Sequence, residues 1–318
     1  MFKSEIPVKI LLTSTSFQDT PGSHQTLLDA QGFELVKLRG PLKEAVMLDV
    51  IEGFDGIVCG DDEITRAVIE KGAKSKLRII SKYGIGLDKI DVTAAKEAGI
   101  PVTNCPGVNN VTVAEHVFAL LLSYSKNIIA EHNYIQAQNW KRLIGTELFD
   151  KTIGIVGLGN IGKEVAKRAL AFGLKVIVYD KFIDENFAAS YPIQVAKHID
   201  EVLKVSDIIT LHVSLNPGTK DLVNPGNIGL CKVGVIVINT ARAGLISNEL
   251  IMQAIESKQF GAYLTDVLEE EPMVKDHPFL KYENIIITPH IGSRTYESVV
   301  RQGTMAVENL LEYINQSK

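Results

Sequence analysis

Short apolar runs alternate along the chain with stretches whose apolar residues recur every three or four positions. In the first hundred residues, strand-like runs occur at 8–13, 34–38, 56–59 and 77–82, with helical patterns at 24–30, 42–51 and 65–71. Strands and helices that alternate in this way form a parallel sheet covered by helices on both faces. The pattern therefore predicts one small, doubly wound α/β domain.

The same alternation resumes after Asp150 and predicts a second parallel sheet. Its strands are expected at 152–156, 175–179, 207–212, 235–239, 263–267 and 284–288. The fold class predicted is thus α/β, with two doubly wound parallel-sheet domains.

The connecting segment and the end of the chain are predicted to be helical. Thr112 and Glu115 have the spacing of a capping box, and the apolar run 117–122 follows it as a buried helix. Over 295–315, apolar residues at spacings of four and seven indicate a helix with one apolar face.

Composition excludes several classes of protein. The chain has 318 residues, a 46% hydrophobic fraction and a net charge of −5, without long blocks of one sign. Nucleic-acid and membrane partners are not expected, and no run is long enough to span a bilayer. The N-terminus lacks a signal-peptide core, and three sparse cysteines, Cys59, Cys105 and Cys231, favour a reducing, cytoplasmic location. No metal site is expected.

The most specific local motif is a glycine-rich loop, Gly157-Leu-Gly159-Asn160-Ile161-Gly162. It follows an expected strand and opens an expected helix, which is the context of a dinucleotide-binding fingerprint. Gly157 permits a tight turn, Gly159 lets the backbone approach a pyrophosphate, and Gly162 lets helix and strand pack closely. The helix N-terminus then faces the pyrophosphate charge.

An acidic residue, Asp180, ends the next expected strand. Its carboxylate can accept hydrogen bonds from both ribose hydroxyls of NAD and would repel a 2′-phosphate. The sequence therefore predicts NAD rather than NADP, although Lys181 is a nearby cation.

Polar residues that could serve hydride transfer follow three successive strands of the second sheet. Arg242 follows 235–239, Asp266 lies at the end of the next strand with Glu271 after it, and His290 follows 284–288. Ligands of parallel sheets bind beyond the carboxyl ends of strands, and histidine exchanges protons near neutral pH. We interpret the side chains of the remaining histidines as structural.

These segments resemble the D-isomer-specific 2-hydroxyacid dehydrogenase family, particularly its phosphoglycerate dehydrogenase and glyoxylate/hydroxypyruvate reductase branches. The resemblance covers essentially the whole chain. It rests on the glycine loop, on Asn239-Thr-Ala-Arg242, on Asp266-Val…Glu271-Pro272 and on Thr288-Pro-His290-Ile-Gly292, in the family's order.

The resemblance implies a domain organisation and a homodimer. A flavodoxin-like substrate domain, 1–102, would be completed by the C-terminal helix, 292–318, and 103–291 would form a Rossmann NAD-binding domain. The segment 108–150 resembles the family's dimer arm.

The resemblance also implies roles for individual residues. Arg242 would bind the carboxylate of a 2-keto acid, and His290 would exchange a proton with its keto oxygen. Glu271 would hydrogen-bond the second imidazole nitrogen, fix its tautomer and favour its protonated form. The implied NAD-binding set is Gly157, Gly159, Asn160, Ile161, Gly162, Asp180, His212, Val213, Thr219, Thr240, Ala241, Asp266 and Gly292.

Substrate contacts are also implied in the first domain, after the strand at 77–82. Gly84 and Gly86 favour a nest of backbone N–H groups, and in the related dehydrogenases this loop, here Ile85 and Gly86, holds the substrate carboxylate. We expect Lys82 and Tyr83 to line the pocket. Asp61 and Asp62 stand where the phosphoglycerate branch commonly has a basic residue, and they would disfavour a phosphate if they point inward.

Three alternatives to a dehydrogenase of a small D-2-hydroxy acid stay open. They are a 3-phosphoglycerate dehydrogenase without a regulatory domain, a dehydrogenase of an unusual substrate such as a phosphonate analogue, and an NAD-sensing binding module of the co-repressor type. Co-repressors of this type often have long disordered tails, and the sequence shows none, which argues against the third alternative.

Overall fold

The computed structural model describes residues 7–316 and separates the chain into two compact units. The first unit runs to Asn109 and takes up the chain again from Arg294, and the second comprises Asn110–Ser293. The chain therefore crosses between the units seven residues after the expected boundary at 102 and two residues after the one at 291.

The first unit contains a five-stranded parallel sheet in the order β2-β1-β3-β4-β5. Its strands are β1 (Lys9–Leu12), β2 (Glu34–Lys37), β3 (Gly56–Cys59), β4 (Ile79–Lys82) and β5 (Val102–Thr103). Its helices are α1 (Thr15–Asp19), α2 (Ser23–Asp29), α3 (Glu44–Val50), α4 (Arg66–Ser75), α5 (Val92–Glu97) and α12 (Tyr296–Gln316). This strand order is the flavodoxin-like order, with its switch point between β1 and β3.

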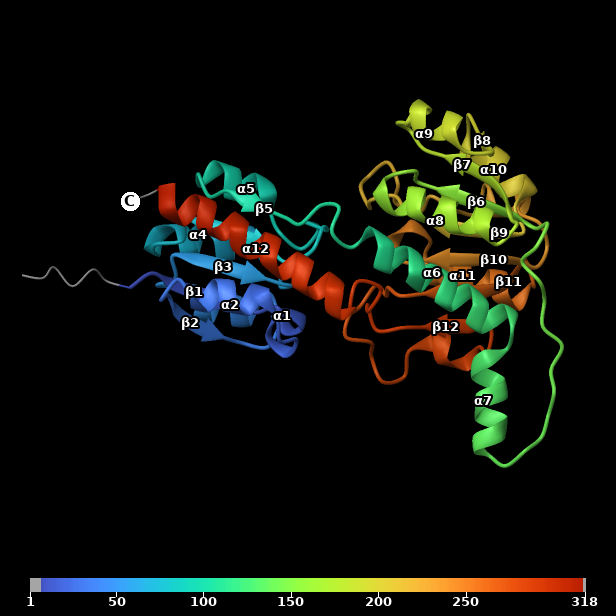
Figure 1. Ribbon diagram of the computed structural model, residues 1–318, viewed down its shortest axis with the longest axis horizontal. Helices are drawn as coiled ribbons and strands as arrows, with labels where there is room; N and C mark the ends of the chain where they lie inside the picture. The colour runs from blue at the N-terminus through green and yellow to red at the C-terminus, as the bar shows by residue number, and fades with distance from the viewer. Residues whose placement is uncertain (1–6, 317–318) are drawn as a thin grey trace, which may run out of the picture. The chain divides into compact units, whose positions relative to one another are not determined.

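Alternation along β1 explains why helices cover both faces of this sheet. Ile10 and Leu12 pack with the apolar side of α12, whereas Leu11 packs with α3 and α4 on the opposite face. The C-terminal helix α12, drawn in red in Figure 1, lies beside α2 and over β4 although it is distant in sequence. Its stripe of Val299, Ala306, Leu310 and Ile314 is buried, as the periodicity predicts.

The second unit contains a seven-stranded parallel sheet in the order β12-β11-β10-β9-β6-β7-β8. Its strands are β6 (Thr152–Val156), β7 (Lys175–Tyr179), β8 (Ile193–Val195), β9 (Ile208–Leu211), β10 (Val235–Asn239), β11 (Phe260–Thr265) and β12 (Ile285–Ile287). Its α-helices are α6 (Asn110–Ser125), α7 (Ile128–Gln136), α8 (Asn160–Ala171), α9 (Glu185–Ser190), α10 (Ile199–Val205) and α11 (Asn248–Glu256). Three 3₁₀ turns complete it: η1 (Ile228–Leu230), η2 (Ala243–Leu245) and η3 (Pro278–Lys281).

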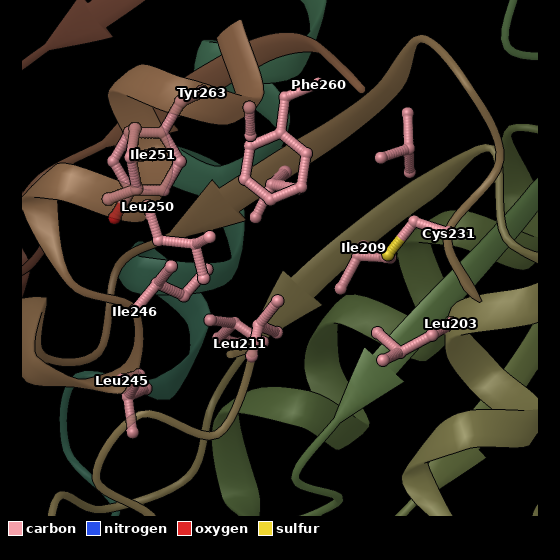
Figure 2. Packing of buried hydrophobic residues seen from close by; sticks show 14 of the residues in the cluster. Leu203, Ile209, Leu211, Cys231, Leu245, Ile246, Leu250, Ile251, Phe260 and Tyr263 are labelled. Carbon is pink, nitrogen blue, oxygen red and sulfur yellow. The ribbon is translucent and has the colours of Figure 1, made fainter. Parts of the chain in front are cut away.

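This order is that of a Rossmann fold with one additional strand, and its switch point lies between β6 and β9. One face packs on α6 and α8, and the other packs on α10 and α11. Figure 2 shows part of the core on the face covered by α10 and α11, which contains Ile209 and Leu211 of β9, Phe260 of β11, Leu203 of α10 and Leu250 of α11. Burial on both faces explains why these strands are nearly continuous apolar runs.

One expected local feature is wrong. Helix α6 begins at Asn110, so Thr112 is a buried residue within the first turns of the helix rather than its cap. Glu115 forms an ion pair with Arg168 of α8, at 3.4 Å, instead of turning back toward the backbone at 112. A Thr-x-x-Glu spacing also suits a helix interior, and here tertiary packing decided between the two.

Candidate active site

The glycine loop joins β6 to α8 at the switch point of the second sheet. Gly157 has a φ of +103°, and a Cβ there would lie 2.7 Å from the carbonyl carbon of His212. A Cβ on Gly162 would lie 2.0 Å from the Gly157 oxygen. The fold itself therefore requires glycine at both positions.

Gly159 is different, because a Cβ there would meet no protein atom within 4 Å. It is the N-cap of α8, its φ of −69° suits any residue, and its side of the loop is exposed. The glycine leaves open space directly before the first N–H groups of α8, carried by Asn160 and Ile161. That arrangement fits a pyrophosphate that approaches the helix N-terminus.

Asp180 lies at the end of β7, next to this loop. Its Oδ2 accepts a hydrogen bond from Leu158 N at 2.6 Å, and its Oδ1 accepts one from Phe182 N at 2.9 Å. Each carboxylate oxygen has a second lone pair, so the residue can orient the loop and still accept ribose hydroxyls.

The end of β9 forms the other side of the switch point. Nε2 of His212 lies 2.9 Å from Oγ1 of Thr210, and burial lowers the pKa of His212 to about 3, so this imidazole is neutral. Val213 follows, and Thr219 closes the next loop by donating to Ser214 O at 2.6 Å. The structure thus places His212, Val213 and Thr219 in one segment beyond the strand.

Arg242, Glu271 and His290 follow β10, β11 and β12, which are neighbours in the sheet. Parallel pairing brings the carboxyl ends of these strands to one edge. Thr240 Oγ1, Ala241 and Gly292 lie in the same turns, so all of the residues predicted for this part of the site come from the same edge.

His290 and Glu271 form a direct pair. Nδ1 of His290 lies 2.7 Å from Oε2 of Glu271, and each side chain is 33% exposed. The other carboxylate oxygen of Glu271 accepts the N–H of Leu268 at 3.0 Å, which orients the carboxylate. With Nδ1 donating to Glu271, Nε2 is the ring nitrogen turned away from Glu271, and an imidazole nitrogen can exchange a proton with a reacting group near neutral pH.

Arg242 is held by its own backbone turn. Buried Asn239 accepts a hydrogen bond from Ala241 N at 3.0 Å and donates to Arg242 O at 2.9 Å. The guanidinium, half-buried, donates to Ala241 O at 2.7 Å through Nη1. A planar, permanently charged fork in this position can bind a carboxylate with two hydrogen bonds.

Asp266 lies under the turn that carries His290 and is 2% exposed. Its Oδ1 accepts the hydroxyl of Thr288 at 2.5 Å and Ile291 N at 2.9 Å, and its Oδ2 accepts Gly292 N at 2.7 Å. Burial by itself raises the pKa of Asp266, but these hydrogen bonds and the nearby ring of His116, whose Nε2 lies 3.4 Å from Oδ1, outweigh it and hold the pKa below its usual range. The carboxylate is therefore ionised.

In the first unit, the loop after β4 carries the other predicted substrate residues. The carbonyl groups of Gly84 and Ile85 accept hydrogen bonds from Cys105 N and Asn104 Nδ2, each at 2.8 Å. These bonds use only carbonyl groups, so they do not compete for the N–H groups of Ile85 and Gly86. Tyr83 is buried against Phe17.

The two acidic residues after β3 have different roles in the structure. Asp62 is fully buried and accepts hydrogen bonds from the Thr13 hydroxyl and from the N–H groups of Leu42 and Gly60. Asp61 instead lies 2.6 Å from Nζ of Lys82, which also donates to Gly60 O at 2.5 Å. The Lys82 side chain is 4% exposed, so its charge is buried and balanced by Asp61.

The sequence did not indicate the roles of three residues that hold this site in place. Asn239 hydrogen-bonds to the backbone of the Arg242 turn, and His116 and Thr288 contact each other beside Asp266. Asn239 and Thr288 belong to the quoted motifs, so their position beside Arg242 and His290 could have indicated them. His116 had no such signal, because it lies on a helix far from the strands in sequence.

Between residues 7 and 316, no helix is long and apolar enough to cross a membrane. In the same range, no group of three or more potential metal ligands was found.

The chain is similar to proteins of one family throughout its length. The sequence model of the D-isomer specific 2-hydroxyacid dehydrogenase NAD-binding domain matches residues 118–292. A D-3-phosphoglycerate dehydrogenase of Methanocaldococcus jannaschii is 38% identical over 305 residues, which are 95% of this chain and 57% of that protein. This chain thus spans just over half the length of that relative.

Other relatives match along most of their own length. A hydroxypyruvate reductase of Thermotoga maritima is 39% identical over 276 residues, covering 85% of this chain and 88% of that protein. The crystal structure of a D-lactate dehydrogenase of Aquifex aeolicus, complexed with NAD and lactic acid, superimposes with a TM-score of 0.84 at 29% identity, covering 96% of each chain. With the matched domain covering more than half of its residues, the chain belongs to the D-isomer specific 2-hydroxyacid dehydrogenase family.

Proposed function

We propose that the protein is an NAD-dependent dehydrogenase that interconverts a small 2-keto acid and its D-2-hydroxy acid. The observation that carries this proposal is the 2.7 Å contact between His290 Nδ1 and Glu271 Oε2, two strands from Arg242 at the edge that bears the glycine loop. It supplies an oriented proton donor and acceptor beside a carboxylate-binding cation.

The residues of the second unit fit NAD. Gly157, Gly159 and Gly162 shape the loop, the N–H groups of Asn160 and Ile161 would hold the pyrophosphate, and Asp180 would accept hydrogen bonds from the ribose hydroxyls. His212, Val213 and Thr219 are assigned to the adenine side, and Thr240, Ala241, Asp266 and Gly292 to the nicotinamide side. When bound, the cofactor supplies or accepts the hydride.

The chain's own groups carry out the remaining steps. Arg242 binds the substrate carboxylate through its fork. Nε2 of protonated His290 hydrogen-bonds the keto oxygen and gives it a proton as the carbonyl is reduced, and it takes the proton back in oxidation. Glu271 keeps the tautomer and stabilises the imidazolium. Lys82, Tyr83, Ile85 and Gly86 are the residues of the first unit that we assign to the substrate.

We further propose an unphosphorylated substrate such as glyoxylate or hydroxypyruvate. The ammonium of Lys82 is buried and already balanced by Asp61, at 2.6 Å. A phosphate would have to compete with this carboxylate, and it would meet repulsion from it. The hydroxypyruvate reductase that matches most of its own length supports the same class.

A second candidate, 3-phosphoglycerate dehydrogenation, is supported by the 38% identity to the archaeal phosphoglycerate dehydrogenase. The test is NADH consumption with glyoxylate, hydroxypyruvate, phosphohydroxypyruvate, pyruvate and 2-oxoglutarate, each repeated with NADPH. We expect turnover of an unphosphorylated acid with NADH. Turnover of phosphohydroxypyruvate alone would establish the second candidate, and NADH binding without any turnover would favour a sensor.

The assembly and location in this proposal are a homodimer in the cytoplasm. Helix α7 buries none of its residues, and Trp140 and Ile144 in the following segment are 81% and 98% exposed. Figure 1 shows α7 and this segment extending away from the sheet of their own unit. An apolar arm of this kind supports pairing with a second copy. Three buried thiols suit a reducing compartment.

A further inference from the structure

His116 lies on α6, far in sequence from the strands that carry the site, yet it reaches the turn of His290. Its side chain is 15% exposed. Nε2 lies 2.9 Å from Oγ1 of Thr288 and 3.4 Å from Oδ1 of Asp266. The ring also packs against Gly292, where a Cβ would lie 3.5 Å from Cδ2 of His116 and 2.9 Å from Oδ2 of Asp266.

The direction of these hydrogen bonds follows from their chemistry. The ionised Asp266 carboxylate can only accept, so the single hydroxyl proton of Thr288 goes to Asp266 Oδ1 at 2.5 Å. Nε2 of His116 must then donate to Thr288. The result is a chain from His116 through Thr288 to Asp266, whose carboxylate also accepts the N–H groups of Ile291 and Gly292.

The turn held in this way contains a strained residue. His290 has a φ of +53°, a left-handed conformation that is uncommon for residues other than glycine. Such conformations persist when the surrounding contacts fix them. Here the anchored residues are Thr288 on one side of His290 and Ile291 and Gly292 on the other, and all of them are bound to Asp266.

On the basis of the proposed function, we infer that His116 is a positioning residue for the reaction. It orients Thr288 and Asp266, which fix the left-handed turn that presents His290. A residue of α6, outside the sequence motifs, therefore contributes to the geometry of proton transfer. Asp266 holds the turn of His290 in addition to its proposed contact with nicotinamide.

The test uses three variants of the whole chain. His116→Leu removes the donor and keeps an apolar side chain, and His116→Gln keeps an N–H donor near the position of Nε2. Glu115→Gln, next to His116 on α6 and with a side chain 60% exposed, is the matched control. The first readout is the NMR spectrum of protein labelled at histidine, with the seven histidines assigned by substitution.

We expect the His290 resonance to shift in His116→Leu, to lie near its wild-type position in His116→Gln and to be unchanged in Glu115→Gln. This readout needs no turnover. If the resonance shifts but the wild type reduces no keto acid, the positioning role stands and the proposed dehydrogenase fails. If it does not shift, the positioning role is overturned whatever the activity.

The second readout separates positioning from folding. Misplacement of a catalytic group can cost up to about 100-fold in rate, so kcat of His116→Leu should fall by about tenfold or more, with Kd for NADH within about twofold of wild type. The deuterium isotope effect with 4-deuterated NADH should not decrease, because chemistry becomes slower than product release. Equal losses in kcat and NADH binding in both His116 variants, with a lowered Tm, would overturn the inference.

A fourth variant covers the case in which His116→Leu does not fold. Thr288→Val keeps the shape of the side chain and removes the hydroxyl between His116 and Asp266. We expect the same shift of the His290 resonance, and an unmoved resonance would contradict the proposal.

Discussion

At the scale of single residues, the site depends on side chains that hydrogen-bond to the protein through some atoms or lone pairs and can bind a ligand through others. Nδ1 of His290 hydrogen-bonds to Glu271, which fixes the orientation of the imidazole ring. Asp180 gives one lone pair of each oxygen to a backbone N–H and retains the other. Each residue is thereby oriented before any ligand arrives, and this preorganisation lowers the cost of reaching the reactive geometry.

His290→Ala tests the proton-transfer role. General acid catalysis contributes about 100- to 10,000-fold, so kcat for keto-acid reduction should fall by about that factor while Kd for NADH stays within about twofold. Stopped-flow reduction and NADH fluorescence titration measure the two quantities. The control is His132→Ala, an exposed residue of α7. An equal loss of NADH affinity would assign His290 to cofactor binding instead.

Asp180→Ala tests the choice between cofactors. Without the carboxylate, the ribose hydroxyls lose their acceptor and a 2′-phosphate loses a repulsive charge. The ratio of Kd for NADPH to Kd for NADH should fall by about tenfold or more, which corresponds to about 1.4 kcal/mol. Asp184→Ala, which removes the nearby carboxylate paired with Lys163, should leave the ratio unchanged. An unchanged ratio in Asp180→Ala would exclude the ribose role.

At the scale of elements, the same glycine loop serves the fold and the ligand at different positions. Gly157 and Gly162 are required by backbone atoms within 3 Å of where their Cβ would be, whereas Gly159 faces open space. In the first unit, the imidazole of His24 in α2 packs closely against α12. A Cβ on Gly303 of α12 would lie 2.6 Å from this ring, and one on Gly22, which precedes α2, would lie 2.9 Å from it.

A pair of alanine variants separates the two functions of the loop. Gly162→Ala forces a methyl group against the Gly157 carbonyl, and overpacking of this kind costs about 1–3 kcal/mol of unfolding free energy. Gly159→Ala should leave the urea midpoint unchanged and weaken NADH binding, because its methyl group would occupy the space proposed for the pyrophosphate. Normal NADH affinity in Gly159→Ala would place the cofactor phosphates elsewhere.

The contact between α2 and α12 should make stability sensitive to acid. Burial lowers the pKa of His24 below its ordinary value of 6.5, so the folded state keeps the imidazole neutral. In the unfolded chain, His24 binds a proton as pH falls below about 6.5. The contribution of His24 to the free energy of unfolding is therefore complete above that pH and is lost progressively below it. Urea titrations between pH 8 and 5 should show a steeper loss for the wild type than for His24→Gln. Parallel curves would remove His24 as the cause.

At the scale of the whole molecule, two parallel sheets share one chain, with the first completed by α12 after the chain has built the second. Much of the segment between α6 and β6 is exposed, and α7 within it has no buried residue. Ile128, Ile129 and Ile135 of α7 are each about half exposed, and Phe149 is 72% exposed. Large apolar side chains gathered on one arm are typical of a protein–protein contact.

The proposed homodimer predicts a specific effect of charge on this arm. Ile144→Asp introduces a carboxylate at a side chain that is 98% exposed, so the fold of the protomer should not change. Its burial in a dimer would leave an unpaired charge, and the dimer Kd should rise by at least about tenfold. Sedimentation velocity measures the mass, and circular dichroism checks the fold. Val233→Asp, 79% exposed and outside the arm, is the control. A wild-type monomer, or a variant dimer of unchanged affinity, would contradict the proposal.

The sequence by itself determined the two parallel sheets, the glycine loop and the residues at the ends of β10, β11 and β12. These features depend on local periodicity and on short motifs, because the residues that produce each of them are neighbours in the sequence. Short elements such as α1, α5, β5 and β8 escaped it, because a few residues cannot display a period.

Only the tertiary structure decided which side chains hold the site in place. His116 reaches Asp266 across 150 positions of sequence, Asp61 rather than Asp62 balances Lys82, and Thr112 became the interior of a helix rather than its cap. Such contacts depend on how helices pack on the sheets, and the residues involved carry no local pattern that distinguishes them from other polar residues. Chemistry that lies within a motif can be predicted from the chain, whereas the contacts that orient it arise only when distant elements meet.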